Sequence, residues 1–391
     1  MFVRIGNTPR DYAWGSTTAI AGLLGSEPSG GPEAELWLGA HPGSPARVLD
    51  PASTGGAADL AAWERTSDLP YLLKVLAADG PLSLQAHPSP EQARAGFERE
   101  NAAGLAADSP DRNYKDPFHK PELIFALSDP FEALCGFRDP AESRAALERL
   151  AAAGTGGAVI SGFARTLDGE PGAVLRRATE WLLGGDSDVD LLVAEVVRAA
   201  RALPGDRDAD TVLLLQEAFP GDPGIVLALL LNRATLRPGE VLYLPAGNIH
   251  AYLRGLGIEL MAASDNVLRG GLTRKRIDVP ELVSVLDFTP IAAATLAPEH
   301  PAPGMEEFRP DVPDFRLDVV RLGGGTTSAE VPLSGPTIVL CTSGAVELSG
   351  ATDRATLARG EAVLATEEER SVTATVSADG EGTLFLAMPN R

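Results

Sequence analysis

The sequence is poor in histidine, cysteine and aromatic residues, and it lacks a long apolar run. Of 391 residues, 5 are histidine and 2 are cysteine, and aromatic residues make up 5%. The longest apolar stretches, such as residues 225–231, fall far short of the ~18 residues that a membrane-spanning helix needs. We therefore expect no membrane partner. Cys135 and Cys341 lie far apart in the sequence, which suits reduced thiols better than a disulfide framework.

Basic residues are also scarce relative to acidic ones. The chain has 33 Lys and Arg against 54 Asp and Glu, a formal net charge of −21. Long-range repulsion from such a chain argues against nucleic acid as a partner. An anionic small molecule is compatible with this charge only if basic side chains converge locally. The N-terminus has no basic region followed by an apolar stretch, so we predict no secretory signal and a cytoplasmic protein.

What is present is the composition of an ordinary globular protein, with 44% hydrophobic and 22% charged residues. Short apolar segments typical of strands fill the first part of the chain, interrupted by one predicted helix at 91–101. Apolar residues then recur at three- and four-residue spacing, which predicts about five helices within 138–232. Strand-like segments follow to the end. The sequence predicts a mainly β fold with an α-helical insertion: residues 1–137 and 233–290 form a first β-domain, 138–232 the insertion, and 291–391 a second β-domain.

Two strand-like segments combine apolar and functional side chains. In residues 82–87, alternation places the apolar side chains on one face. The opposite face carries Ser83, Gln85 and His87. It is either a solvated strand face or the wall of a site. Lys120 and Glu122 likewise share one face of their segment, either as an exposed cross-strand pair or as a cation and an acid that face a site.

A third segment is more specific. Residues 239–250 fit the pattern G-x5-P-x-G-x2-H and resemble the second signature motif of the cupin superfamily. In that fold, Gly and Pro turns bracket a strand and bring the histidine, here His250, into the mouth of a β-barrel as a metal ligand. The final Asn of the motif is absent, and Arg254 stands in its place.

Together these segments provide a plausible metal-ligand set of two imidazoles, one carboxylate and one amide oxygen: Gln85, His87, Glu122 and His250. Zn²⁺ accepts such ligands. Two histidines and one carboxylate also suit non-haem Fe(II). The ligand types alone therefore leave the metal open.

The basic residues suggest an anion site. Arg269 precedes two glycines, so a ligand can approach the backbone closely beside a guanidinium that suits phosphate. Lys275 adds a second charge, although an exposed basic loop would look the same. Lys74 is embedded in an apolar strand, where an ammonium is costly unless it faces a cavity or a partner anion.

Several motifs in order resemble the type I phosphomannose isomerase family. They occupy Trp14-Gly15, residues 35–42, Lys74, and residues 84–88, 119–122, 135–137, 245–252 and 264–275. One departure is visible, since the family often has Thr-Pro-Lys where this chain has Thr273-Arg274-Lys275. The resemblance implies two cupin β-barrels, of which the C-terminal one, without histidine after about residue 315, is metal-free and structural.

The resemblance also implies an activity: the zinc-dependent interconversion of mannose 6-phosphate and fructose 6-phosphate through an enediolate, a step that can serve GDP-mannose synthesis. It implies one Zn²⁺ per chain on Gln85, His87, Glu122 and His250. It assigns catalytic roles to Arg269, Lys120, Glu259 and His119. It assigns substrate binding to Lys74, Ser83, Lys275, Trp14, Glu35 and Tyr252. The general base stays open among Glu259, His119 and Lys120.

Two alternatives belong to other functional classes. An Fe(II) cupin dioxygenase would share the histidine and glutamate ligands but would not need Arg269, Lys275 and Lys74. A non-catalytic sugar-binding bicupin would keep both barrels but would need no poised base. The sequence leaves the oligomeric state open, and a monomer is compatible with it.

Overall fold

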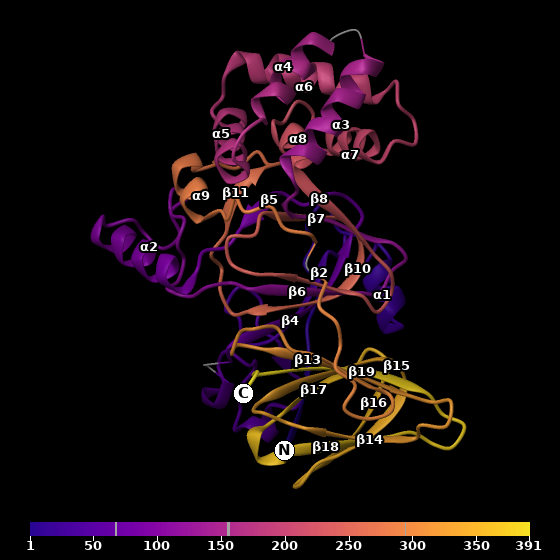
Figure 1. Ribbon diagram of the computed structural model, residues 1–391. Helices are drawn as coiled ribbons and strands as arrows, with labels where there is room; N and C mark the ends of the chain where they lie inside the picture. The colour runs from indigo at the N-terminus through magenta and orange to yellow at the C-terminus, as the bar shows by residue number, and fades with distance from the viewer. Residues whose placement is uncertain (67–68, 155–156, 294) are drawn as a thin grey trace.

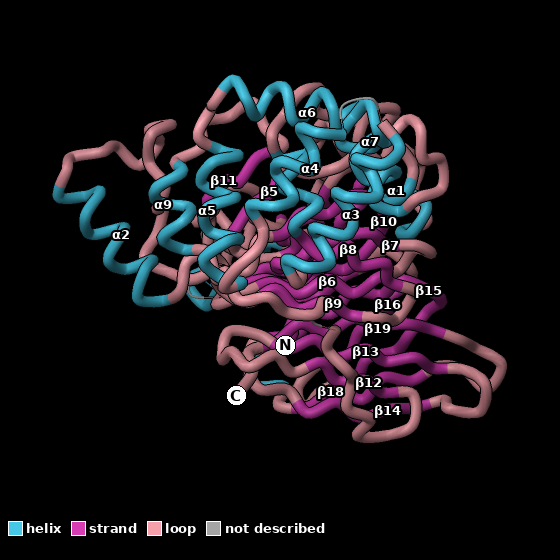
Figure 2. Tube along the Cα trace, turned by 45° about the horizontal axis from the view of Figure 1, so that its top comes forward, coloured by secondary structure: helices cyan, strands magenta, loops and turns pink. Residues whose placement is uncertain are grey.

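The computed structural model describes residues 1–391 except 67–68, 155–156 and 294. Most helices gather at one end of the molecule, and the strands lie below them in the view of Figure 1 (Figures 1 and 2). The expected mainly β fold with an α-helical insertion is confirmed. Among the described residues, no helix has the length and apolar character to cross a membrane.

One of the two sheets, here called the site sheet, is built around a long strand. Its described strands are β2 (Glu35–Leu38), β4 (Tyr71–Ala78), β5 (Leu84–Ala86), β6 (Glu122–Ala126), β7 (Phe131–Phe137), β8 (Leu231–Leu236), β9 (Val241–Leu244), β10 (His250–Ala262) and β11 (Leu268–Gly271). β10 pairs antiparallel with β4, β5, β6 and β7. The register sets Glu259 opposite Lys74 and His250 opposite Gln85. Segments far apart in the sequence are therefore neighbours across one strand.

The second sheet, here called the C-terminal sheet, includes two strands from the N-terminal part of the chain. Its described strands are β1 (Phe2–Gly6), β3 (Arg47–Val48), β12 (Met305–Phe308), β13 (Arg316–Leu322), β14 (Ser328–Pro332), β15 (Thr337–Ser349), β16 (Arg354–Ala358), β17 (Ala362–Ala365), β18 (Ser371–Thr375) and β19 (Gly382–Met388). The expected division assigned residues 1–137 to the first barrel, but β1 pairs with β17 and β3 pairs with β1. This pairing lets Val3 and Ile5 pack into the core between the sheets.

The two sheets share that core. Leu73 and Leu260 from the site sheet belong to the same buried cluster as Leu317, Leu340 and Phe385 from the C-terminal sheet. Burial of this much apolar surface is the main stabilising term in the contact between two sheets. The sheets therefore form one continuous body.

The helical insertion lies between β7 and β8. Its helices are α3 (Pro140–Ala153), α4 (Gly157–Thr166), α5 (Pro171–Leu183), α6 (Ser187–Ala200), α7 (Arg207–Ala218) and α8 (Gly224–Leu227). Carboxylates cap several of them, since Asp139 and Asp206 accept backbone N–H groups at the starts of α3 and α7. A 3₁₀ turn at Ala228–Leu230 follows α8, and β8 begins directly after it.

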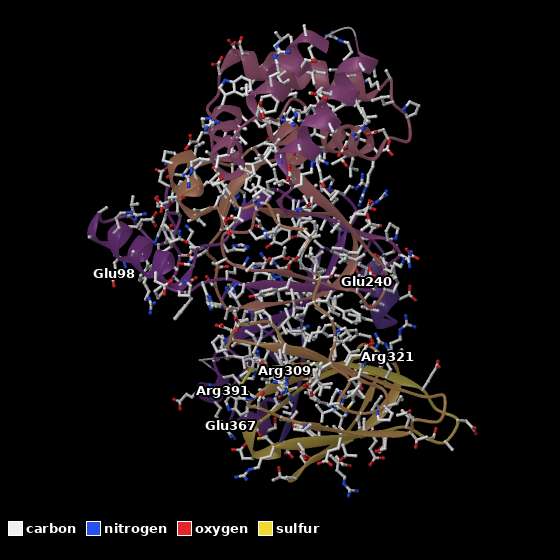
Figure 3. The ribbon with its side chains drawn as sticks, in the orientation of Figure 1. Glu98, Glu240, Arg309, Arg321, Glu367 and Arg391 are labelled. Atoms are coloured by element: carbon white, nitrogen blue, oxygen red, sulfur yellow. The ribbon has the colours of Figure 1, made fainter. Side chains whose placement is uncertain are left out.

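Three further α-helices of the described residues lie outside the insertion: α1 (Ala19–Leu24), α2 (Pro90–Ala102) and α9 (Val279–Val285). A capping box starts α2, the helix predicted at 91–101: Gln92 N–H donates to Ser89 Oγ, and Ser89 N–H donates to Gln92 Oε1. α2, which carries Glu98, projects from the body (Figure 3).

Candidate metal centre and substrate cavity

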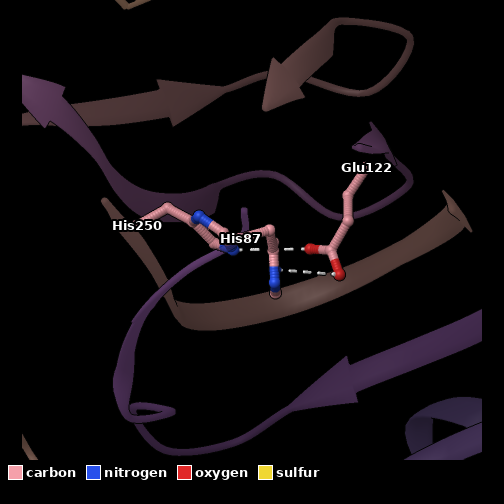
Figure 4. A group of neighbouring side chains, drawn as sticks. All are labelled: His87, Glu122 and His250. Atoms are coloured by element: carbon pink, nitrogen blue, oxygen red, sulfur yellow. Dashed lines mark ion pairs between the residues drawn. The ribbon is translucent and has the colours of Figure 1, made fainter. Parts of the chain in front are cut away.

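Two histidines and a glutamate meet inside the site sheet. His87 directly follows β5, Glu122 begins β6, and His250 begins β10. All three side chains are buried, and their ligand atoms lie within 4.8 Å of one another. Figure 4 shows both imidazoles facing the carboxylate. The strand register thus brings together three of the four predicted metal ligands.

Backbone carbonyls determine which nitrogen of each histidine faces Glu122. His87 Nδ1 lies 2.7 Å from the carbonyl oxygen of Asn266, and His250 Nδ1 lies 3.0 Å from that of Asn248. Because a carbonyl only accepts hydrogen bonds, each Nδ1 carries a proton and each Nε2 of a neutral ring presents a lone pair. Each Nε2 is 3.4 Å from a Glu122 carboxylate oxygen. Lone pairs that face a carboxylate repel it unless a cation lies between them.

The protonation states agree with a metal centre. Burial, with the nearby Lys120, lowers the pKa of His87 to about 4, so its imidazole is neutral at neutral pH. Burial alone would raise the pKa of Glu122, but Lys120 and His87 hold it well below the usual range. His87 Nε2 and Glu122 Oε2 are buried without a hydrogen-bond partner. The described residues therefore fit a bound metal ion.

Gln85, the fourth predicted ligand, lies against the same group. Its side-chain nitrogen is 3.3 Å from His250 Nε2. A half-turn of the amide exchanges its nitrogen and oxygen, so Oε1 can occupy the same position. The complete set of donors is one that Zn²⁺ accepts.

A cavity of about 490 Å³ opens beside this centre. It is the size of a small-molecule site. Most of the predicted catalytic and substrate-binding residues line it: Trp14, Glu35, Lys74, Ser83, Lys120, Tyr252, Glu259, Arg269 and Lys275. The structure therefore brings these residues, which are distant in sequence, together around one cavity.

His119 is the exception. Its Nε2 lies 2.8 Å from Asp314 Oδ2, and the side chain is absent from the described lining of the cavity. Its neighbour Lys120 lines the cavity, and its ammonium is 2.8 Å from Glu122 Oε1. Of these two neighbours, Lys120 therefore faces the cavity and His119 contacts Asp314.

A buried charge network occupies one wall. The Lys74 ammonium lies 2.8 Å from Glu259 Oε2 and 3.5 Å from Glu35 Oε1. Trp37 Nε1 donates to the second oxygen of Glu35 at 3.0 Å. Burial opposes the charged form of Lys74, yet the neighbouring carboxylates raise its pKa. Burial foremost, with Glu122 and Glu35, raises the pKa of Glu259 despite Lys74.

Arg269 and Lys275 have a different environment. Nearby Arg269, with partial burial, lowers the pKa of Lys275, and burial lowers the pKa of Arg269. Among the described residues, no carboxylate forms an ion pair with either side chain, whereas Lys74 and Lys120 both have such partners. Two neighbouring cations without a counter-ion form a site for an anion.

Sequence reasoning gave no role to His41 and Asp265, which also line the cavity. His41 Nε2 lies 3.2 Å from Asp265 Oδ2, and His41 Nδ1 accepts the N–H of Gly43. Burial would raise the pKa of Asp265, but His41 lowers it. Both residues lie in the motifs noted above. Their contact with each other could not be predicted from the sequence, because it joins distant segments.

Comparisons with known proteins agree with this geometry. A family model described as phosphomannose isomerase type I, catalytic domain, matches residues 2–140. The mannose-6-phosphate isomerase of Escherichia coli strain K12 is 37% identical over 383 residues, covering 94% of this chain and 95% of that protein. The human mannose-6-phosphate isomerase is 34% identical, covering 86% of each.

Solved structures show the same similarity in three dimensions. A crystal structure of a zinc-bound mannose 6-phosphate isomerase superposes with a TM-score of 0.85 at 34% identity and covers 100% of both chains. A crystal structure of a phosphomannose isomerase mutant from Salmonella typhimurium gives a TM-score of 0.86 at 34% identity, again over 100% of both chains.

Proposed function

The chain belongs to the type I phosphomannose isomerase family, and we propose how its own residues carry out that family's reaction. The reaction is the zinc-dependent interconversion of mannose 6-phosphate and fructose 6-phosphate. One observation supports the assignment most strongly: a buried centre of His87, Glu122 and His250 opens into a cavity that also contains two cations with no carboxylate partner in the described part of the chain. A dioxygenase or a non-catalytic sugar-binding protein would not require that combination.

His87, Glu122 and His250 would hold the zinc, with Gln85 contributing its amide oxygen. Bound zinc supplies a Lewis acid that stabilises negative charge on the sugar oxygens without redox chemistry. Asn266 and Asn248 fix the two imidazoles through their backbone carbonyls. These contacts keep the ligand nitrogens turned toward the centre before any metal arrives.

Arg269 and Lys275 would bind the phosphate, with Ser83 as a hydrogen-bond donor. This assignment is supported by the absence of a carboxylate ion-pair partner for either side chain among the described residues. Lys74 was expected to share this role, but it is paired with Glu259 and Glu35. We assign Lys74 to holding those two carboxylates in place.

Proton transfer between C1 and C2 needs a group that alternates between base and acid. Glu259 lines the cavity, and burial raises its pKa, which suits a carboxyl group for both roles. The Lys120 ammonium, beside Glu122, would stabilise the negative charge of the enediolate. Burial raises the pKa of Tyr252 well above its usual value, so its hydroxyl stays protonated and can donate to a sugar oxygen.

The remaining residues complete the site. Trp14 and Glu35 lie in the cavity wall, where they would contact the sugar. His119 is not assigned a catalytic role, because its ring nitrogen is bound to Asp314. A cytoplasmic location is part of the proposal, and the buried free thiols of Cys135 and Cys341 are compatible with it.

The substitution Glu259→Gln tests the proton-transfer assignment, because it keeps the shape of the side chain and removes its basicity. We expect kcat to fall by roughly 10²–10⁴-fold, the usual contribution of a general base, with a smaller change in KM and no loss of zinc. Exchange of the C2 hydrogen with solvent deuterium should fall in parallel. Glu240→Gln, a change on an exposed turn, is the control. Near-normal turnover of Glu259→Gln would contradict this assignment and give the proton-transfer role to Lys120.

A further inference from the structure

The turn that carries Lys275 has an unfavourable backbone conformation. It follows β11, and Leu272, Thr273, Arg274 and Lys275 all line the cavity. Leu272 has φ +52°, one of only two positive values for non-glycine residues in the described part of the chain. A leucine avoids this left-handed region, because its Cβ crowds the following carbonyl. Contacts from outside the turn must therefore hold it.

Asp222 provides those contacts from the helical insertion. Its Oδ1 accepts the backbone N–H of Leu272 at 2.9 Å, and its Oδ2 accepts that of Thr273 at 3.1 Å. Oδ1 also accepts the N–H of Gly224 at 2.7 Å, which ties the carboxylate to the start of α8. No described lysine or arginine forms an ion pair with Asp222. Its hydrogen-bonding capacity is directed to the backbone.

Close packing surrounds this carboxylate. A Cβ on Gly224 would lie 2.9 Å from Leu272 N, and one on Gly271 would lie 3.0 Å from Gly224 Cα. Glycine at both positions lets the two backbones touch. The Leu272 side chain is fully buried in the apolar cluster of the insertion. The turn is therefore held from the helical side through both its backbone and its side chain.

We propose that Asp222 is a positioning residue for the substrate phosphate: it holds the turn at residues 271–275 so that Lys275 faces Arg269. The inference rests on the proposed phosphate site and deepens it. Asp222 touches neither cation, so its effect passes through the backbone of the turn. The helical insertion thereby takes part in substrate recognition without supplying a group to the chemistry.

The experiment is steady-state kinetics of the zinc-loaded enzyme with Asp222→Ala. We expect KM for mannose 6-phosphate to rise about tenfold, the effect of losing the one charge-assisted hydrogen bond from Lys275 to the phosphate, while kcat stays within about threefold. The inhibition constant of inorganic phosphate should rise by the same factor, and zinc content should not change. A loss of folding stability alone would alter neither constant in the folded fraction.

Two variants serve as controls. Asp186→Ala removes another carboxylate of the insertion, one that caps α6 by accepting the N–H of Asp188, and it should leave KM unchanged. Asp222→Asn keeps one acceptor oxygen, so it is the variant to use if Asp222→Ala does not fold. It should raise KM by a smaller factor. A fall in KM with asparagine would mean that Asp222 acts through its charge, which would overturn the proposal.

Lys275→Ala distinguishes failure of the proposed phosphate site from failure of the positioning role of Asp222. If it raises KM and the phosphate inhibition constant while Asp222→Ala changes neither, the phosphate site stands and the positioning role is wrong. If neither variant changes them, the phosphate is bound elsewhere and both assignments fall. If KM and the phosphate inhibition constant rise in both variants, the phosphate site and the positioning role are both supported.

Discussion

At the scale of single residues, the metal centre depends on where two protons lie. The carbonyls of Asn266 and Asn248 place them on Nδ1 of His87 and His250, which leaves both Nε2 atoms unprotonated. The sequence indicated these histidines through motif spacing and alternation. It could not indicate Asn266 as a partner, because that contact joins positions 179 residues apart. Long-range backbone contacts of this kind leave no local pattern.

The first prediction concerns His87 itself. His87→Ala should lower zinc affinity by more than ~100-fold, since loss of an outer hydrogen bond alone costs up to that much, and turnover should disappear with the metal. Metal content after dialysis, measured beside activity, checks this expectation. His300→Ala, at an exposed histidine, should keep both. Full zinc occupancy in the His87 variant would remove it from the ligand set.

At the scale of elements, the sequence predicted strands better than their partners. The segments around Gln85 and Glu122 were identified as strand-like with polar groups on one face, and His250 was identified through the Gly and Pro turns before it. The pairing of β10 with four other strands, which makes those faces a single wall, was not visible. β1 shows the same limit, because nothing local assigns its residues to a partner as distant in sequence as β17. The orientation of the His119 side chain was not predictable either, because it depends on the contact with the distant Asp314.

The strand β13 supplies a prediction about pH. Burial raises the pKa of Asp318 to about 7; Glu307 acts in the same direction and Arg316 opposes it. Between the ordinary aspartate pKa of 3.8 and about 7, the folded state binds a proton that the unfolded state releases. Stability should therefore fall as pH rises through this window, by at most ~4 kcal/mol.

The matched variant is Asp318→Asn, which resembles the protonated side chain at every pH. It should have a flatter dependence of unfolding free energy on pH, and it should exceed the parent protein in stability above about pH 7. Urea unfolding across the pH range measures both. The exposed Asp379→Asn should follow the parent curve. Equal slopes for the two variants would contradict the buried proton.

At the scale of the whole molecule, two sheets and a helical insertion meet around contacts that cross between them. The order of β, α and β segments predicted the three parts. It did not predict the shared core or the side chains that cross it, because those depend on packing between distant segments. Tyr71 of β4 is an example: its hydroxyl donates to the carbonyl of Pro336 at 2.8 Å and accepts the N–H of Ile338 at 3.1 Å.

Tyr71→Phe tests how strongly this crossing contact stabilises the protein. Removal of the hydroxyl leaves a buried N–H and a carbonyl unpaired, so unfolding free energy should fall by about 2–3 kcal/mol. Zinc content and KM should not change, since Tyr71 lies outside the cavity lining. Denaturant titration checks the loss. Tyr243→Phe, where the hydroxyl forms no hydrogen bond within the described chain, should cost much less.

The position of the insertion affects the order of folding. β7 ends where β8 begins, with Phe137 opposite Leu231, so the chain leaves the sheet and returns to it at one point. The helices between them depend on neighbours close in sequence, whereas β10 must find partners across long separations. Local contacts form faster than distant ones. The insertion can therefore assemble early and shorten the effective distance across which β7 and β8 must meet, acting as a scaffold for the slower closure of the sheet.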